Sequence, residues 1–503
     1  MACGSGRSEG SVTSHDSSQV KHRSFAGDVL RLASGTTLAQ VLIVAAAPVL
    51  TRLYEPAAFG TAAQFAAVVG IAAVVACLRY DLAIVLPKTD EDGAALLWVS
   101  LALASCAGLG MWLLVEVLPD EVLTALGSDT IPDYALLVGL GTSASGLMSA
   151  LSYWYSRRSR YGRLSVARVL ASGTTAVGQI AYGAAVGGSA VGLVGSSLAG
   201  QGLTVAALSG QVTVIDGALL LRGLSWQRAG AGLRRYWRYP AFGTWSALMN
   251  TLSWQLPALI LGAFFGSAVV GYYALGFRTL AMPMNLVGTA LGQVFFQRAA
   301  AARHDGVLDS LVRRVYGLLI ELGFLPFAVL SLAGGSVFEL VFGSDWREAG
   351  IYTQILAMWT LVWFISSPLS FLYGVLDKQA PGLVWSAAIL ATRLVSLLIG
   401  GWLGDARVAL ALFSGSGILV YGYMDYYLLS AAGVRWRQTL PGLRRAVMLS
   451  VAACVVIGLA VLLHAGDLVV TLLSAVAIVG NTALAGVSWR RKHRRPPGDQ
   501  VPT

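Results

Sequence analysis

The sequence has 503 residues, of which 56% are hydrophobic and 12% are charged, and its formal net charge is +10. Soluble globular proteins carry about a quarter charged residues, so this composition excludes a soluble domain. Apolar runs of about 20 residues recur along the whole chain, and each can cross a hydrocarbon core of about 30 Å. The composition therefore predicts an all-α, polytopic membrane protein.

The four cysteines and five histidines form no metal-binding pattern in the sequence. The cysteines lack CxxC spacing, and no two histidines have the HExxH arrangement. The sequence also lacks a nucleophile elbow, a P-loop and a pair of catalytic carboxylates. Membrane enzymes that build envelope sugars generally need a large outer loop with catalytic groups, and no such loop is predicted. We therefore expect no metal, no cofactor and no enzymatic activity.

Residues 1–24 are rich in serine and glycine and lack the apolar core of a signal peptide. We expect them to form a disordered cytoplasmic tail. Fourteen predicted membrane spans follow this tail. They cover residues 27–51, 58–86, 94–118, 133–155, 165–187, 190–214, 240–264, 268–297, 312–333, 350–376, 382–403, 406–430, 446–464 and 467–489.

The longest loop separates the sixth span from the seventh, which suggests two lobes of six spans each with the last two spans appended. Its segment GLSWQRAGAGLRRYWRY combines basic and aromatic residues, which is typical of a helix lying along the membrane surface. The predicted units are an N-lobe (25–214), this basic cytoplasmic linker (215–239), a C-lobe (240–430), two spans with a basic loop (431–489) and a basic cytoplasmic tail (490–503).

A weak internal repeat supports the division into two lobes. The segment YEPAAFGTAAQF at Tyr54–Phe65 aligns with FGSAVVGYYALG at Phe265–Gly276, and the alignment pairs Gly60 with Gly271. Each segment joins the first span of its lobe to the second. Two copies in the same membrane orientation are a known transporter architecture.

The opening spans of both lobes are the polar ones, and such helices commonly face each other across the central cleft of two-lobed transporters. Their polar or kink-forming residues are Ser34, Thr37, Gln40 and Pro48 in span one, Gln64 in span two, and Ser246, Asn250, Trp254 and Pro257 in span seven.

Two arginines of the N-lobe lie near the ends of their spans. Arg52 lies at the outer end of span one, where we expect an interfacial side chain near the exit of any cleft. Arg79 lies near the inner end of span two, and Asp81 does not share its face on a straight helix. We interpret Arg79 first as a snorkelling or structurally paired residue, and second as a gate.

Span eight carries Arg278 well inside an apolar stretch. An arginine at this depth costs roughly 2.5–3.5 kcal/mol on insertion scales, so it faces protein or a water-filled path. Arg278, Asn285, Thr289 and Gln293 fall within roughly 80° on one helix face, and Pro283 should kink the helix between them. Two interpretations remain open, a cavity wall and a hydrogen-bonded seam between helices.

Arg393 lies near the middle of span eleven. Its partner could be Asp425 in span twelve or Glu321 in span nine. A structural ion pair is the first interpretation of Arg393, and contact with a ligand is the second.

The basic residues are distributed asymmetrically if the N-terminus is cytoplasmic. Three arginines fall within spans, and three (Arg52, Arg347 and Arg407) fall in outer loops, so 29 of the 35 lysines and arginines lie on the inner side. The positive-inside rule requires such a bias. It predicts cytoplasmic N- and C-termini, and it explains the net charge by topology and contact with anionic membrane lipids, without nucleic acid.

The chain from about residue 25 to about residue 430 resembles, in the order and spacing of its motifs, the polysaccharide-biosynthesis flippases. These O-antigen-flippase-like proteins belong to the multidrug/oligosaccharidyl-lipid/polysaccharide exporter superfamily. The matching stretches are GTTLAQVLIVAAAPVLTRLYEPAAFG, LRYDLAIVLP, LSWQLPALILGAFFGSAVVGYYALGFRTLAMPMNLVGTALGQVFFQR and VFGSDWREAGIYTQILAMWTLVWFISSPLS.

The resemblance implies two six-helix lobes around a central cavity, two further helices, and alternating access. The implied cargo is a polyprenyl-diphosphate-linked oligosaccharide, moved from the inner to the outer leaflet of the bacterial cytoplasmic membrane for surface polysaccharide synthesis. Polysaccharide polymerase and chain-length proteins are the implied partners. The candidate substrate-binding residues are Arg278, Asn285, Thr289, Gln293, Asn250, Arg79, Arg52 and Arg393.

Among these candidates, the resemblance places Arg278 on the diphosphate, because this residue lies in the matching motif of span eight. Arg52 and Arg79 also match family motif positions. Arginine suits such a role, since its guanidinium group can bind phosphate oxygens in a bidentate way that lysine cannot.

Two other functions remain open at this point. A cation-coupled exporter of multiple drugs or organic cations, from the same superfamily, would need a carboxylate deep in a lobe. Asp425 and Glu321 are the candidates for that carboxylate. A scaffold or scramblase-like assembly factor without transport activity would need neither Arg278 nor its polar stripe.

Overall fold

A computed structural model describes residues 35, 37–119, 121, 132–284, 289–463 and 465–493. The predicted tail at 1–24 and the last residues of the predicted C-terminal tail, 494–503, lie outside the described residues. All elements of the described chain are helices or single helical turns.

The first group of helices, here called the N-lobe, ends at Gly223. Its members are Thr37–Leu53, α2 (Pro56–Ala76), α3 (Tyr80–Ala83), α4 (Asp90–Val117), α6 (Ala135–Arg157), α7 (Tyr161–Ala185) and α8 (Ala190–Gly223).

The short helix α9 (Trp226–Arg235) leads to the second group, here called the C-lobe, and two more helices follow the C-lobe. The C-lobe consists of α10 (Thr244–Phe265), α11 (Ser267–Pro283), α12 (Thr289–His304), α13 (Leu308–Phe342), α14 (Arg347–Leu369), α15 (Leu372–Val375), α16 (Gln379–Trp402) and α17 (Ala406–Ala431). The final pair is α18 (Leu440–Leu462) and α19 (Asp467–His493).

Nine helices of the described chain are long and apolar enough to cross a membrane, and a bent pair within 436–462 raises this number to ten. Two shorter apolar helices are Thr37–Leu53 and Asp467–Asn481. Each of the fourteen predicted spans overlaps a described helix, and span eight is divided between α11 and α12. The prediction of an all-α, polytopic membrane protein is confirmed, and the number of fourteen spans is consistent with it.

Local sequence explains where several helices begin or end. Thr89 caps α4 by accepting a hydrogen bond from the Asp92 amide, and the acidic first turn favours a helix N-terminus. Gly266 separates α10 from α11 at a φ of 82°, a conformation that favours glycine. Span two does not continue as a straight helix, because Leu78 and Arg79 adopt left-handed conformations between α2 and α3.

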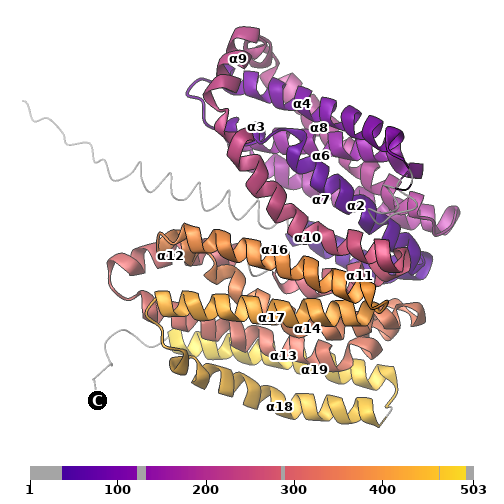
Figure 1. Cartoon of the computed structure of the whole chain (residues 1–503), viewed down its shortest axis with the longest axis vertical. Coiled ribbons are helices and arrows are strands. Elements are labelled where there is room, and N and C mark those ends of the chain that lie inside the picture. The colour runs from indigo at the N-terminus through magenta and orange to yellow at the C-terminus, as the bar shows by residue number, and fades with distance from the viewer. Residues whose placement is uncertain are drawn as a thin grey trace, which may run out of the picture.

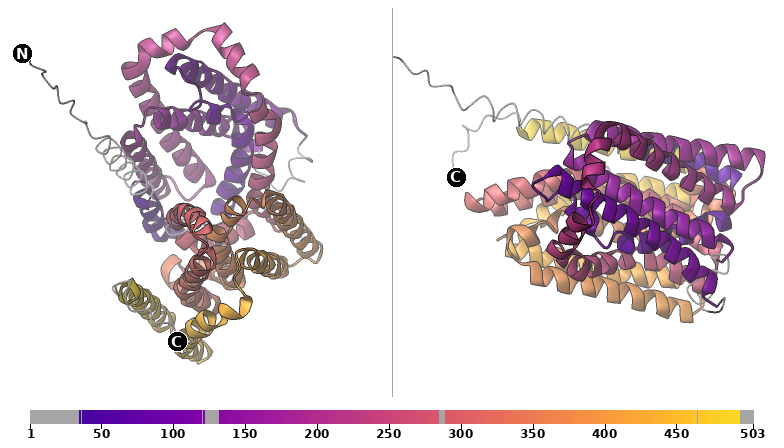
Figure 2. Two further views of the ribbon diagram at one scale, coloured as in Figure 1. Left: turned by 90° about the vertical axis from the view of Figure 1, so that its left-hand side faces the viewer. Right: turned by 90° about the horizontal axis from the view of Figure 1, so that it is seen from above.

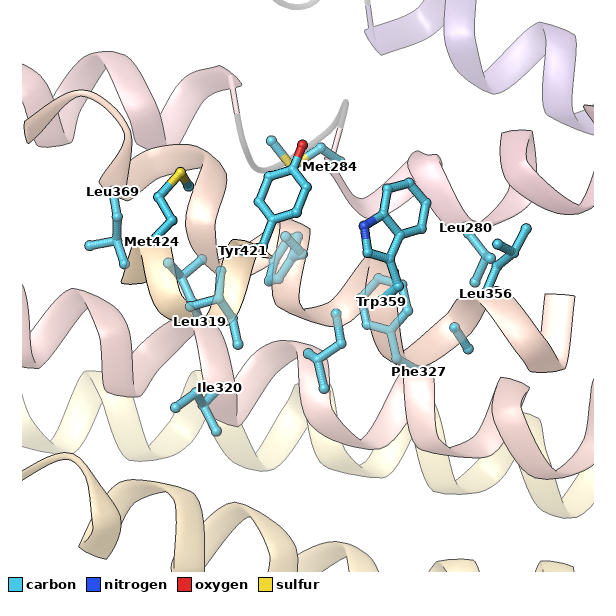
Figure 3. Packing of buried hydrophobic residues seen from close by; sticks show 14 of the residues in the cluster. Leu280, Met284, Leu319, Ile320, Phe327, Leu356, Trp359, Leu369, Tyr421 and Met424 are labelled. Carbon is cyan, nitrogen blue, oxygen red and sulfur yellow. The ribbon is translucent and has the colours of Figure 1, made fainter. Parts of the chain in front are cut away.

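Each lobe has its own apolar core. Trp154, Tyr155 and Leu97 belong to the main core of the N-lobe. Trp359 and Phe327 belong to the core of the C-lobe, which Figure 3 shows from close by. The helices α18 and α19 pack against α13, on the side of the C-lobe that is remote from the N-lobe (Figures 1 and 2).

The lobes meet where α2 and α11 begin. A Cβ atom added to Gly60 would lie 1.6 Å from the carbonyl oxygen of Ser267, and one added to Gly271 would lie 2.0 Å from that of Pro56. Glycine allows two helix backbones to approach this closely. These two glycines are the pair that the internal repeat aligns, so the contact joins equivalent points of the two lobes.

Aromatic residues reinforce the same end of the interface. The Nε1–H of Trp346 donates to the carbonyl oxygen of Thr51 at 3.0 Å. The ring of Phe59 packs edge-on against Trp346, with ring centroids 4.9 Å apart. The lobes converge at this end and diverge toward α9 and α12 (Figure 1).

The connection between the lobes differs in part from the prediction. The helix α8 continues to Gly223, past the predicted end of the N-lobe at residue 214. The helix α9 has no buried residue, and Trp226 at its start is 95% exposed. Its arginines and aromatic neighbours suit the membrane surface that the sequence predicts for it.

Candidate functional site

A cavity of about 400 Å³ lies between the two lobes. This volume falls within the range of about 300–1,000 Å³ that is typical of small-molecule sites. The first helix, α2, α6, α7 and α8 supply one wall, and α11 supplies the other. Most of the lining side chains are apolar, and the polar residues among them are Ser145, Gln179, Ser197, Gln201 and Arg278.

The helix α11 carries Arg278 into this cavity. Arg278 follows Gly271 by about two helical turns, so both residues lie on the face of α11 that is directed toward the N-lobe. The Gly60–Gly271 contact fixes the start of α11 against α2 and thereby sets the position of Arg278. The side chain of Arg278 lines the cavity and is exposed within it.

Arg278 makes no ion pair or hydrogen bond with any described residue, whereas many other arginines have acidic partners. Arg160 lies 2.6 Å from Asp216, and Arg407 lies 2.6 Å from Glu348. The described lining of the cavity includes no carboxylate. A guanidinium group in this position within a membrane protein favours a bound anion.

Arg393 lies inside the C-lobe, only 4% exposed, and does not line the cavity. It donates hydrogen bonds to the carbonyl oxygen of Ser253 at 2.9 Å, to the Ser253 hydroxyl at 3.0 Å and to the Tyr421 hydroxyl at 3.2 Å. Its guanidinium carbon lies 4.1 Å from the ring centroid of Trp254. These contacts support the structural interpretation of Arg393.

The prediction that Asp425 or Glu321 pairs with Arg393 was wrong. Within the described chain, Glu321 lies 3.5 Å from Arg445 instead. Asp425 is 3% exposed inside the C-lobe, and its Oδ1 has no hydrogen-bond partner in the structure. A backbone carbonyl, two hydroxyl groups and aromatic rings surround the guanidinium group of Arg393 in place of a carboxylate.

Arg79 lies in the break after α2, Asp81 lies in the short helix α3 that follows, and neither lines the cavity. Asp81 accepts a hydrogen bond from the Ser149 hydroxyl at 2.6 Å, and no ion pair joins it to Arg79 in the described chain. The Nε of Arg79 is buried and lacks a partner there. The structural and gating interpretations of Arg79 both remain predictions.

The other candidate residues lie elsewhere or outside the description. Arg52 is exposed and donates to the carbonyl oxygen of Pro48 at 2.7 Å, and Asn250 is exposed on α10 without lining the cavity. Asn285 lies outside the described residues, and so do the side chains of Thr289 and Gln293, although these two residues lie within α12. Their role in binding remains a prediction.

The structure adds polar residues that the sequence analysis missed. Gln179 of α7 donates from Nε2 to the carbonyl oxygen of Leu193 at 3.1 Å and to the Ser197 hydroxyl at 3.2 Å. Gln201 lies one turn after Ser197 on α8, and its Oε1 is buried without a hydrogen-bond partner. Gln179 in span five and Gln201 in span six were the available signal in the sequence.

The described residues contain no group of three or more histidine, cysteine or acidic side chains that could hold a metal ion. Asp425 and Glu321, the carboxylates that a cation exporter would use, do not line the cavity. The chemistry of the described cavity is therefore that of one cation, several neutral hydrogen-bonding groups and an apolar surface.

The fold defines a class of protein. It is similar to a structure described as "Lipid II flippase MurJ, inward closed conformation", with a TM-score of 0.65 and 12% identity over 92% of this chain and 99% of that chain. It is also similar to an inward-facing multidrug resistance MATE family transporter of the MOP superfamily. For that structure the TM-score is 0.56 and the identity is 15%, over 80% of this chain and 95% of that chain. The fold thus defines a multi-pass helical membrane protein with the architecture that these two structures share.

The family follows from the sequence. A family model described as "Polysaccharide biosynthesis protein" matches residues 49–350, and the chain belongs to this family. The chain thus combines this family with a fold that is similar to those of structures described as a flippase and a transporter.

Two relatives carry related descriptions. The succinoglycan biosynthesis transport protein ExoT of Rhizobium meliloti (strain 1021) is 25% identical over 396 residues, which cover 75% of each chain. The lipopolysaccharide biosynthesis protein WzxC of Escherichia coli (strain K12) is 24% identical over 173 residues, or 33% of this chain and 34% of WzxC. The match to WzxC thus spans about a third of that relative.

Proposed function

We propose that this protein moves a polyprenyl-diphosphate-linked oligosaccharide from the inner to the outer leaflet of the bacterial cytoplasmic membrane. The movement occurs by alternating access of the cavity between the lobes, and the product serves surface polysaccharide synthesis. The observation that carries the proposal is Arg278, a cation without a described partner in a cavity whose described lining has no carboxylate.

The cargo chemistry matches this cavity. A bilayer excludes a diphosphate with an attached sugar, because charge and hydroxyl groups lose water in hydrocarbon. A guanidinium group binds phosphate oxygens in a bidentate way and lowers that cost. The names of ExoT and WzxC, together with the lipid II flippase MurJ, support a cargo of this kind.

The proposed direction rests on the distribution of charge. The positive-inside rule places both termini and α9 in the cytoplasm, and the Gly60–Gly271 contact then lies at the outer side. We propose that the cargo enters from the side of α9, toward which the lobes diverge (Figure 1). The protein is surrounded by membrane lipids, and polysaccharide polymerase and chain-length proteins are its proposed partners.

Export of an organic cation is the weaker alternative. A cationic drug would be repelled by Arg278 and would need a carboxylate in the cavity. Asp425 lies inside the C-lobe, and Glu321 lies beside Arg445, so neither meets this need in the described structure.

The test compares Arg278→Ala with Arg278→Lys in cells that depend on this protein for surface polysaccharide. We expect Arg278→Ala to reduce export at least tenfold and Arg278→Lys to retain part of it, because lysine keeps the charge but loses the bidentate geometry. Drug resistance should not change. Surface polysaccharide and drug susceptibility are measured in the same strains.

Arg347→Ala is the matched control, since Arg347 is exposed and pairs with Glu339 away from the cavity. It should export normally. Normal export by Arg278→Ala would show that Arg278 does not bind the diphosphate. Loss of drug resistance with unchanged export would favour the cation exporter.

A further inference from the structure

The two walls of the cavity differ in chemistry. The wall from α11 carries the charged Arg278 next to Ala274 and Leu275. The N-lobe wall carries no charged residue in the described lining, but it presents hydroxyl and amide groups from three helices. These groups belong to Ser145 on α6, Gln179 on α7, and Ser197 and Gln201 on α8.

Hydrogen bonds fix part of this N-lobe wall. Gln179 uses Nε2 to reach Leu193 and Ser197, and Ser197 donates to the carbonyl oxygen of Leu193 at 2.8 Å. These bonds hold the Gln179 side chain across the groove between α7 and α8. No described hydrogen bond uses its Oε1, which remains an acceptor at the cavity.

Gln201 extends the same row by one turn of α8. Ser197 and Gln201 are four residues apart, so they share one helix face and are separated by about 6 Å along the axis. The Oε1 of Gln201 is buried and has no partner in the structure. A buried amide oxygen without a hydrogen bond costs about 1–3 kcal/mol, and a bound donor would remove this cost.

Neutral amides and hydroxyls recognise neutral polar groups. Sugar hydroxyl and acetamido groups both donate and accept hydrogen bonds, which matches the mixed donors and acceptors of glutamine and serine. A diphosphate would instead prefer the guanidinium group on the opposite wall. A prenyl tail would leave the glutamines unpaired.

We infer that Gln179, Ser197 and Gln201 bind the first sugar of the cargo, while Arg278 holds the adjoining diphosphate. This inference rests on the proposed function and adds that each lobe binds a different part of the cargo. The cargo then bridges the C-lobe and the N-lobe across one cavity. A site that lacks a sugar partner is left with unpaired amide groups, so the sugar contributes to selection of the cargo.

The experiment measures binding of two probes to the purified full chain in lipid nanodiscs. One probe is a polyprenyl diphosphate, and the other is the same lipid carrying one N-acetylglucosamine. The wild-type protein should bind the sugar-bearing probe more tightly. Gln201→Leu should lower the affinity for the sugar-bearing probe about tenfold and leave the affinity for the sugar-free probe unchanged, because the amide contacts the sugar alone.

Gln211→Leu is the matched control, because Gln211 lies on the same helix but lines a different pocket, between α7 and α8. It should bind both probes like the wild-type protein. Gln201→Leu should also keep or raise the Tm, since the substitution removes an unsatisfied buried group. A lower Tm with equal weakening of both probes would assign Gln201 a structural role and overturn the inference.

Two further results separate this inference from the proposed function. Equal wild-type affinity for both probes, or unchanged binding by Gln201→Leu, would overturn the sugar contact while leaving the diphosphate site intact. Unchanged binding of both probes by Arg278→Ala would overturn the diphosphate site, and the Gln201→Leu comparison would then decide the sugar contact by itself. Absence of wild-type binding to either probe would overturn both.

Discussion

Arg393 shows how a membrane-embedded cation is satisfied within one lobe. Three hydrogen bonds join it to Ser253 and Tyr421, and the rings of Trp254 and Trp359 lie 4.1 and 5.5 Å from its guanidinium carbon. A desolvated cation–π contact is worth about 2 kcal/mol or more. The residue therefore acts on the stability of the C-lobe.

Replacement of Arg393 should destabilise the protein. Arg393→Ala removes the hydrogen bonds and ring contacts and opens a cavity, so we expect a loss of about 2–4 kcal/mol and a clearly lower Tm. Thermal unfolding of the purified protein in detergent measures this change. Arg407→Ala is the control and should cost about 0–1 kcal/mol, because Arg407 forms an exposed ion pair with Glu348.

An unchanged Tm for Arg393→Ala, combined with loss of export, would contradict the structural role. That result would indicate contact with the cargo, which was the second interpretation of Arg393.

The sequence separates Arg278 from Arg393 only in part, because both are single arginines within apolar spans and the polar stripe of span eight is the one difference between them. Their environments depend on residues far away in the chain. Trp254 and Tyr421 reach Arg393 from α10 and α17, whereas Arg278 meets a cavity wall made by the other lobe. The helical stripe of span eight favoured a cavity position for Arg278, and the structure places it there. Its role in binding remains a proposal.

At the scale of helices, the contact between α2 and α11 depends on two glycines. The backbone at Gly60 and Gly271 leaves no room for a side chain. In a membrane, such small residues allow the close van der Waals packing that associates helices. The contact therefore stabilises the conformation in which the lobes converge at this end.

Gly60→Val should disfavour that conformation, since its Cβ would lie 1.6 Å from the Ser267 carbonyl oxygen. We expect spin labels at Glu55→Cys and Asp345→Cys, in a background without the native cysteines, to move farther apart. Pulsed electron paramagnetic resonance measures this distance. Gly110→Val on α4 is the control, because nothing lies within 4 Å of a Cβ atom at Gly110.

An unchanged distance in Gly60→Val would mean that the contact does not hold the lobes together at this end. Gly60→Ala, with a smaller side chain, serves as the second variant if Gly60→Val does not fold.

The helices themselves were largely predictable, because long apolar runs must form helices in a bilayer. The exceptions arise from local backbone geometry. Leu78 and Arg79 adopt left-handed conformations that break span two. Neither residue type favours a positive φ, so the sequence does not predict this turn. Gln179 and Gln201 could not be singled out from the sequence, because spans five and six also contain serines, threonines and Gln211, which do not all line the cavity.

At the scale of the whole molecule, two lobes with separate cores share one cavity. Each lobe has a main core of its own, and the described contacts at Gly60, Gly271 and Trp346 join the lobes at one end. This arrangement suits alternating access, in which one bundle rocks against the other around a fixed site. The repeat signal in the sequence was weak, but the glycines that it pairs form this contact.

The most direct test of the proposed function is transbilayer movement of the cargo in proteoliposomes. A fluorescent polyprenyl-diphosphate N-acetylglucosamine is incorporated, and its exposure on each leaflet is followed with a membrane-impermeant quencher. The wild-type protein and Arg347→Ala should accelerate movement over protein-free liposomes, and Arg278→Ala should be at least tenfold slower because it lacks the diphosphate contact. Equal rates in wild-type and protein-free liposomes, or in wild type and Arg278→Ala, would contradict the account.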